Sequence, residues 1–252
     1  MNILLYILCG ILAGLLGGYL GVGGGIVIVP FLTLAMGLDI KLAIPVSMAA
    51  IVVNFLASSS EYMKKGMVDL ELMVVLTFAM VLGMLIGSSL LTVIEAGYIK
   101  LLLAGFMLYT AVTLMRGQEK APHVVAANKK SRLRLCAVLA FVGGILAGLV
   151  GVGGGLIVIP LMFLIIGVPL ATARGTSSFI VGFSGAASLA VYFINGLVSL
   201  AVAPSVILGT IIGGKLGGRM GTLAKPTAVK IIFFLLLTYV AIRLIYGAWS
   251  EM

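Results

Sequence analysis

The chain has 252 residues, of which 62% are hydrophobic and 9% are charged. A soluble domain carries about 45–50% apolar and about 25% charged residues, so this composition excludes an ordinary soluble fold and indicates a membrane protein. The formal charge of +9 comes from 16 basic and 7 acidic residues. Because the basic residues lie almost entirely between apolar segments, we interpret the charge as the positive-inside bias and expect no nucleic-acid site.

The first half of the chain contains five apolar segments, and most of them are close to the roughly 18 residues that a membrane helix needs. The second segment is only about half as long: as a helix it rises about 17 Å, half of a hydrocarbon core of about 30 Å. The first segment lacks the basic start and cleavage site of a signal peptide, so we expect it in the mature protein. The five segments lie near Asn2–Leu20, Ile26–Met36, Ala43–Ser60, Leu72–Thr92 and Tyr98–Met115.

A polar stretch divides the chain into a first membrane repeat (1–115), a basic linker (116–134) and a second membrane repeat (135–252). The second half again has five apolar segments, of which the second is short. They lie near Leu133–Val150, Leu156–Ile166, Ala173–Asn195, Leu197–Gly214 and Thr227–Gly247.

The two halves are copies of one repeat, since the sequence GVGGG of residues 21–25 returns at 151–155. The offset of 130 residues holds downstream, where serine meets serine at 47 and 177 and tyrosine meets tyrosine at 62 and 192. Upstream, the matching run GILAGL has an offset of 134. We therefore expect four extra residues near Gly17–Leu20. The fold class is an all-α polytopic membrane protein with two repeats of five segments.

The distribution of basic residues predicts the topology. Thirteen of the sixteen fall on one side if the linker is cytoplasmic, including a predicted loop that carries Lys215, Arg219, Lys225 and Lys230. Both chain ends then lie outside the cell membrane, a bacterial inner membrane or its equivalent. The repeats are inverted, which together with short, glycine-broken segments is typical of secondary transporters.

The two GVGGG turns are the first candidate site. Consecutive glycines permit positive φ and close backbone approach, and a short helix that begins after them presents N–H groups and a positive dipole end to an anion. Glycine used only for helix packing is the alternative. It is the favoured interpretation for Gly83, Gly87, Gly213 and Gly217, and it predicts that Gly83→Ala is much milder than valine at Gly24 or Gly154. The turns match neither the P-loop nor the dinucleotide motif. The candidate substrate-binding glycines are Gly23, Gly24, Gly25, Gly153, Gly154 and Gly155.

Neutral polar residues in the third segments are the second part of the candidate site. Hydroxyls and amides can donate to an oxyanion, whereas the acidic residues of the two halves fall at segment ends and argue against a cation carrier. Back-bonding of each hydroxyl to its own helix is the alternative. Arg174 is either an entrance residue that attracts anions or an interfacial anchor. The polar candidates are Ser47, Asn54, Thr176, Ser177 and Ser184.

The doubled run of glycines, with an apolar segment and a proline after each, resembles the TauE/SafE family of predicted sulfite and organosulfur-anion exporters. The motif Ala-x-x-Thr-Ser at 173–177 and Tyr-x-x-x-Gly at 192–196 also fit that family. The likeness covers nearly the whole chain except the linker. In the first half Val46 stands where the pattern has threonine. The resemblance implies a transporter of a small anion.

We therefore expect a secondary transporter for a small anion, a sulfur oxyanion or an organosulfonate, that works by alternating access between the repeats. The alternatives are a non-transporting membrane assembly subunit and an intramembrane enzyme. The latter has no support from a histidine at membrane depth, a metal-ligand cluster or a Ser/His/Asp set. We expect no cofactor and no metal. Homo-oligomerisation and a coupling ion stay open.

Overall fold

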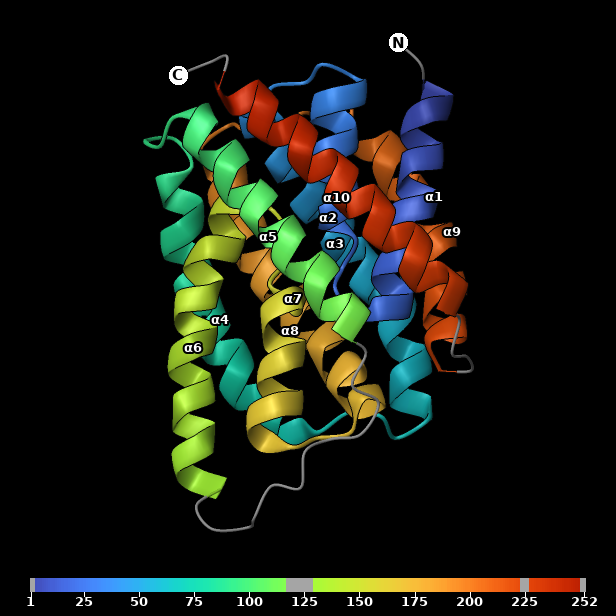
Figure 1. Ribbon diagram of the computed structural model, residues 1–252, viewed down its shortest axis with the longest axis vertical. Helices are drawn as coiled ribbons and strands as arrows, with labels where there is room; N and C mark the ends of the chain where they lie inside the picture. The colour runs from blue at the N-terminus through green and yellow to red at the C-terminus, as the bar shows by residue number, and fades with distance from the viewer. Residues whose placement is uncertain (1–2, 117–128, 223–226, 250–252) are drawn as a thin grey trace.

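The computed structural model describes residues 3–116, 129–222 and 227–249. Every regular element within these ranges is a helix, which confirms the all-α class (Figure 1). Five of the helices, α1, α3, α4, α6 and α8, are long and apolar enough to cross a membrane. The first half consists of α1 (Ile3–Leu20), α2 (Gly25–Pro30), η1 (Phe31–Ala35), α3 (Ile40–Lys64), α4 (Leu70–Leu90) and α5 (Ala96–Arg116). The second consists of α6 (Lys129–Val150), α7 (Gly155–Pro160), η2 (Leu161–Ile166), α8 (Leu170–Ile194), α9 (Ala203–Gly221) and α10 (Thr227–Trp249).

The short second segment of each half changes from an α-helix to a π-helix at a proline. Pro30 ends α2 and Pro160 ends α7, and the next residues form η1 and η2. Proline has no N–H to donate and its ring clashes with the carbonyl four residues earlier, so the regular bonding pattern is interrupted there. The wider spacing of the π-helix is seen where Met36 N–H donates to Phe31 O over 3.3 Å.

The helices of the two halves are intertwined. The first helix of each half packs along the fourth helix of the other, α1 on α9 and α6 on α4, and α5 lies beside α10 (Figure 1). Glycines make these contacts close: a Cβ at Gly213 would lie 2.1 Å from Ile11 O, and one at Gly83 would lie 2.1 Å from Phe141 O. The packing role predicted for these two glycines is therefore confirmed. A backbone oxygen occupies the space at Gly83, so Gly83→Ala should cost stability, and its milder effect relative to valine at the turns stays a prediction.

The first half has no insertion of four residues. α1 ends at Leu20 and α6 ends at Val150, which keeps the offset of 130. Gly14 lies against Thr210 of α9, and Gly144 lies against the corresponding Met80 of α4. The offset of 134 was wrong because glycines recur every four residues along these helices, so a shift of one turn matches glycine with glycine.

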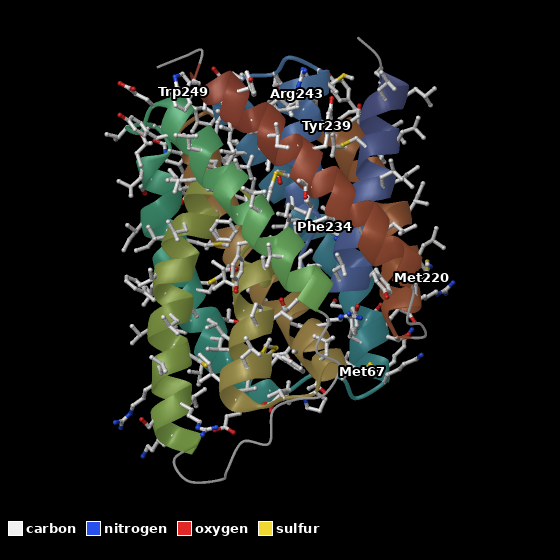
Figure 2. All side chains as sticks on the ribbon, viewed as in Figure 1. Met67, Met220, Phe234, Tyr239, Arg243 and Trp249 are labelled. Atoms are coloured by element: carbon white, nitrogen blue, oxygen red, sulfur yellow. The ribbon has the colours of Figure 1, made fainter. Side chains whose placement is uncertain are left out.

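The two ends of the molecule differ in which elements they hold. In Figure 1, α1 begins and α10 ends at the top, whereas α6 begins at the bottom. Figure 2 places Arg243 and Trp249 at the upper end and Met67 nearest the lower end of the labelled residues, with Met220 between Phe234 and Met67 in height. At the lower end Lys65 Nζ donates to Thr222 Oγ1 at 2.9 Å, and Arg219 lies 3.7 Å from Glu61.

Some predicted boundaries differ from the observed ones. The fourth segment of the second half, expected from Leu197 to Gly214, is the helix Ala203–Gly221. Lys215 and Arg219 therefore lie in α9 and not in a loop. Helix α6 begins at Lys129, inside the predicted linker. The rest of the linker, residues 117–128, and Lys225 lie outside the described residues.

Candidate functional site

The two GVGGG turns have the left-handed backbone that only glycine adopts easily. The φ angles are +73°, +88° and +92° at Gly21, Gly23 and Gly24, and between +72° and +79° at the corresponding Gly151, Gly153 and Gly154. A side chain in this region is disfavoured because its Cβ approaches the following carbonyl oxygen. Each turn leads directly into a short helix, α2 or α7, as the glycine pattern predicted.

The two turns touch each other in the protein interior. A Cβ at Gly25 would lie 2.5 Å from Gly151 O, and one at Gly155 would lie 2.7 Å from Val22 Cα. All residues of both turns are buried. The contact is thus made through Gly25 and Gly155. Gly24 instead faces Ala13 of α1, and Gly154 faces Met80 of α4.

Two serines hold this contact from opposite sides. Ser47 Oγ on α3 donates to Gly151 O at 2.8 Å, and Ser177 Oγ on α8 donates to Gly21 O at 2.8 Å. Each bond joins one half of the chain to the turn of the other half. The hydroxyl hydrogens predicted to bind an anion are therefore engaged by backbone carbonyls in this conformation.

The turns are also tied to the helices by two tyrosines. Tyr62 OH donates to Gly18 O at 2.7 Å, and Tyr192 OH donates to Gly148 O. Both acceptors belong to the last turn of the first helix in their half, directly before the glycines. Both rings are fully buried. The paired tyrosines were noted in the sequence as repeat markers, but their bonds to the helix ends were not predicted.

Asn54 and Ser184 occupy equivalent positions and behave differently. Asn54 Nδ2 donates to Gly23 O at 3.0 Å, so this amide supports the first turn. Its Oδ1 is buried without a hydrogen-bond partner and lies beside the backbone of Gly214. Ser184 Oγ donates to Ile180 O in its own helix at 2.7 Å, which is the alternative that the sequence left open.

Thr176 and Arg174 lie toward the start of α8. Thr176 Oγ1 accepts from the backbone N–H of Asp69 at 2.9 Å, so this hydroxyl connects α8 to the start of α4. The guanidinium carbon of Arg174 lies 5.4 Å from the centre of the Tyr19 ring, within cation–π distance. A Cβ at Gly21 would lie 2.5 Å from Arg174 O. The structure thus brings Arg174 to the first turn, whereas the equivalent Ile44 lies against Gly151 of the second turn.

An apolar pair that was not predicted lies between the turns. Ile51 of α3 and Val181 of α8 are equivalent at the offset of 130, and methyl carbons of both reach the Cβ positions of Gly23 and Gly153. Both side chains are buried. An apolar residue in an apolar segment gives no local signal, but the repeat offset applied to the neighbours of Ser47 and Ser177 could have indicated the pair.

The start of each short helix keeps backbone N–H groups at the turn. Val27 and Ile28 donate to Gly24 O, and Ile157 and Val158 donate to Gly154 O. These are the first bonds within each helix, so the N–H groups before them belong to the set that a helix start leaves for other acceptors. Within the described part of the chain, no group of three or more His, Cys, Asp or Glu side chains could hold a metal ion.

Comparison with known proteins gives one family over almost the whole chain. Residues 6–244 match the family profile described as Sulfite exporter TauE/SafE. A probable membrane transporter protein of Xylella fastidiosa (strain 9a5c) is 30% identical to the chain over 238 residues, which cover 92% of the chain and 90% of that protein. The probable membrane transporter protein YunE of Bacillus subtilis (strain 168) is 27% identical over 269 residues, with 98% of each chain covered. No solved structure matches the chain.

A plant relative shares a shorter stretch. Sulfite exporter TauE/SafE family protein 6 of Arabidopsis thaliana is 30% identical over 97 residues, which are 36% of the chain and 22% of the plant protein.

Proposed function

Because the chain belongs to the TauE/SafE sulfite exporter family of membrane transporters, we propose that it transports a small anion, a sulfur oxyanion or an organosulfonate, by alternating access between its two halves. The observation that carries the proposal is the contact between the two buried glycine turns, where two short helices begin. Irregular backbone is tolerated at membrane depth only where it is buried in protein or lines a cavity. A pair of such turns is therefore a costly feature in a membrane protein, and substrate binding is a reason to keep it.

The chemistry of the turns suits an anion. Backbone N–H groups at the starts of α2 and α7 supply donors, and each helix dipole stabilises a negative charge by roughly 0.3–1 kcal/mol. Glycine at positions 23–25 and 153–155 leaves no side chain of the turn itself over these donors, so they become accessible when the two turns separate. Asp39, Glu61, Asp69, Glu71 and Glu95 all fall near helix ends.

Side chains around the turns then have assigned roles. Arg174 attracts the anion to the first turn, and Asn54 holds that turn through Gly23 O. The methyl groups of Ile51 and Val181 face the carbon portion of an organosulfonate. Ser47 and Ser177 hold the turns together in the closed conformation, and their bonds break when the halves separate. Thr176 and Ser184 support this arrangement from within α8.

Matched contacts support an inverted relation between the halves. The bonds of Ser47 and Tyr62 recur at Ser177 and Tyr192, and α5 and α10 run antiparallel (Figure 1). A rotation of about 180° around an axis in the membrane plane relates the two sets. The protein sits in the cell membrane with the linker in the cytoplasm and both chain ends outside. Arg219, Lys64 and Lys65 lie at the end that this topology places inside.

Ligand-induced thermal stabilisation tests the substrate class. The purified protein is heated with sulfite, sulfate, thiosulfate, sulfoacetate or acetate, with chloride at equal ionic strength as the control. A ligand at about 100 times its Kd adds about 2.7 kcal/mol of stability. We expect a sulfur anion to raise the melting temperature above the acetate and chloride values. Equal melting temperatures in all six salts contradict the proposal.

Cysteine labelling tests the topology separately. Single cysteines introduced in the linker should resist a membrane-impermeant thiol reagent added outside intact cells, and cysteines near residue 250 should react. Labelling of the linker from outside excludes the inverted arrangement.

A further inference from the structure

Helices α3 and α8 meet at Ile51 and Val181, and one side of this meeting point is filled by aromatic rings. The centre of the Phe55 ring lies 5.2 Å from that of Phe179 and 5.4 Å from that of Phe183. Phe55 occupies the space left free by Gly182, where a Cβ would lie 2.1 Å from the ring. We call Phe55, Phe179 and Phe183 the aromatic cluster. Two of its members, Phe179 and Phe183, stand two positions before and two positions after Val181 in α8.

The other side of the meeting point carries small residues at the equivalent positions. At the offset of 130, Gly185 is equivalent to Phe55, Ala49 to Phe179 and Val53 to Phe183. A Cβ at Gly185 would be in ordinary contact with Ile51, Val52 and Met48 at 3.4–3.8 Å, so a small side chain fits there without overlap. A cavity of about 410 Å³ opens on this side. Its lining includes Ala49, Ala186, Leu189, Ala190, Ala203 and Ile207.

One position of the cavity lining differs in volume in a way that matches the aromatic cluster. Ala49 lines the cavity, and its equivalent in the second half is Phe179 of the cluster. At the positions that correspond to Ala186 and Ala203 the first half holds Leu56, which is 65% exposed, and Met73. The cluster side is therefore narrowed by Phe179, whereas the cavity side has alanine at the equivalent position. The cavity end is the end at which α1 begins, because Gly209 of α9 packs against Ile7 of α1.

The side chain of Ile51 lies between Gly185 and the glycine turns. Its Cγ2 carbon lies 3.4 Å from the Cβ position of Gly185, whose neighbour in the chain, Ala186, lines the cavity. Carbons of the same side chain lie 2.9 Å from the Cβ position of Gly23 and 2.8 Å from that of Gly25. Ile51 is fully buried. Val181 contacts the same turns, but the aromatic cluster adjoins it on its other side.

We propose that the glycine turns open toward the cavity end, that Ile51 is the gate residue at this end, and that the aromatic cluster closes the opposite end. A single apolar side chain blocks an apolar passage by excluding water, and one rotamer change or a small helix displacement can hydrate it. At the other end Phe179 is buried and packs on the ring of Phe55, which in turn contacts the half-exposed Phe183, so opening that end requires ring contacts to separate as well. The proposal rests on the proposed function only in taking the turns as the site that is reached.

The test compares two cysteine variants at equivalent positions. In the native protein Cys9 and Cys136 are both buried, and their rate of reaction with N-ethylmaleimide is the baseline. In the variants both are replaced by alanine. Ile51→Cys and Val181→Cys are then reacted with N-ethylmaleimide in the membrane. We expect Ile51→Cys to react roughly tenfold faster or more, since reactivity follows the free energy of local opening. Equal rates, or faster reaction of Val181→Cys, overturn the proposal.

A second matched pair protects the test against misfolding. Ala49→Cys lines the cavity and should react, whereas Phe179→Cys, its repeat equivalent, should stay near the baseline. If Ile51→Cys does not fold, this pair alone decides: similar rates at 49 and 179 contradict the proposal.

Adding an aromatic ring at the cavity end tests whether such a ring is what closes the opposite end. Gly185→Phe gives the cavity end the residue that Phe55 provides at the other end, and a Cβ at Gly185 would meet Ile51, Val52 and Met48 at ordinary contact distances. In the Ile51→Cys background it should lower the labelling rate to the value of Val181→Cys. An unchanged rate in a folded protein, as judged by helix content and melting temperature, is the opposing result. Labelling needs no substrate, so it tests the gate separately from the proposed function. If Ile51→Cys reacts faster but no anion binds, the gate is supported and the proposed function is contradicted.

Discussion

The two glycine turns share one backbone geometry but have different surroundings. The first turn is bonded by Asn54, lies beside Arg174 and faces the backbone of Ala13. At the second turn the equivalent of Asn54 is Ser184, which bonds within its own helix, and the equivalent of Arg174 is Ile44. Here Gly154 faces the flexible end of Met80.

The shared features and the differences have separate meanings. Positive φ, the serine bonds and the tyrosine bonds occur in both halves, so they are requirements of the fold. The amide, the guanidinium and the aromatic cluster each occur at only one of two equivalent places. The first turn therefore has an amide bond and a guanidinium beside it that the second turn lacks.

Valine at the turns is expected to have the largest effect. Gly24→Val and Gly154→Val should both abolish transport, because a β-branched residue resists positive φ at a cost of roughly 1–2 kcal/mol and covers the N–H donors. Gly24→Val should also reduce the amount of folded protein more, since its Cβ would lie 2.4 Å from Ala13 O, whereas a Cβ at Gly154 meets the movable ends of Met80 and Met84. Anion flux into vesicles, normalised to folded protein, measures both effects. If Gly24→Val and Gly154→Val both transport at the normal rate, the turns have only a packing role.

Alanine in the glycine interfaces should be the next most harmful change, and it should be equal in the two halves. Gly83→Ala and Gly213→Ala each place a Cβ 2.1 Å from a carbonyl oxygen of the facing helix. Overpacking of this kind costs about 1–3 kcal/mol. Gly105→Ala is the control, because a Cβ there would have no neighbour within 4 Å. Thermal unfolding should show similar losses of stability in the two variants and nearly unchanged stability in the control. A large difference between the variants at 83 and 213 would show that the two helix interfaces are not equivalent.

Removing the buried tyrosine hydroxyls should have a smaller effect. Tyr62→Phe leaves Gly18 O without its donor, and Tyr192→Phe does the same to Gly148 O. Hydrogen bonds between membrane helices average about 0.6 kcal/mol and reach about 1.7 kcal/mol. We expect losses of about 1 kcal/mol at each site in detergent unfolding titrations. Unchanged stability in both variants shows that these bonds do not fix the turns.

The serine bonds should give the smallest effect, visible best as coupling. Ser47→Ala and Ser177→Ala should each cost about 0.6 kcal/mol. Because both bonds hold the same contact between the turns, the double variant should lose less than the sum. Ser184→Ala, whose hydroxyl bonds within α8, should be additive with either. Strict additivity of 47 and 177 indicates that the two bonds act independently.

The repeat offset made much of the fold predictable. It located the paired turns, the short segments after them and the equivalence of Ser47 with Ser177. It could not identify the acceptors of these serines, because a sequence match does not say which half a side chain bonds. The predicted start of α9 failed because Leu197–Val202 is as apolar as the helix that follows, so hydropathy gives no boundary there. The aromatic cluster was also missed, since a phenylalanine in a membrane segment is expected on composition alone.

The intertwined helices also have a consequence for biogenesis. α1 is made first, but its partner α9 is about 200 residues later in the chain. During synthesis the glycine face of α1 therefore has no matching surface, and the first half cannot reach its final packing before the second half is inserted. Incompletely packed intermediates of this kind are prone to misassembly. The cell must protect or retain the first half for most of the time of translation, and mutations at the α1–α9 interface should act as defects of maturation before they act as defects of transport.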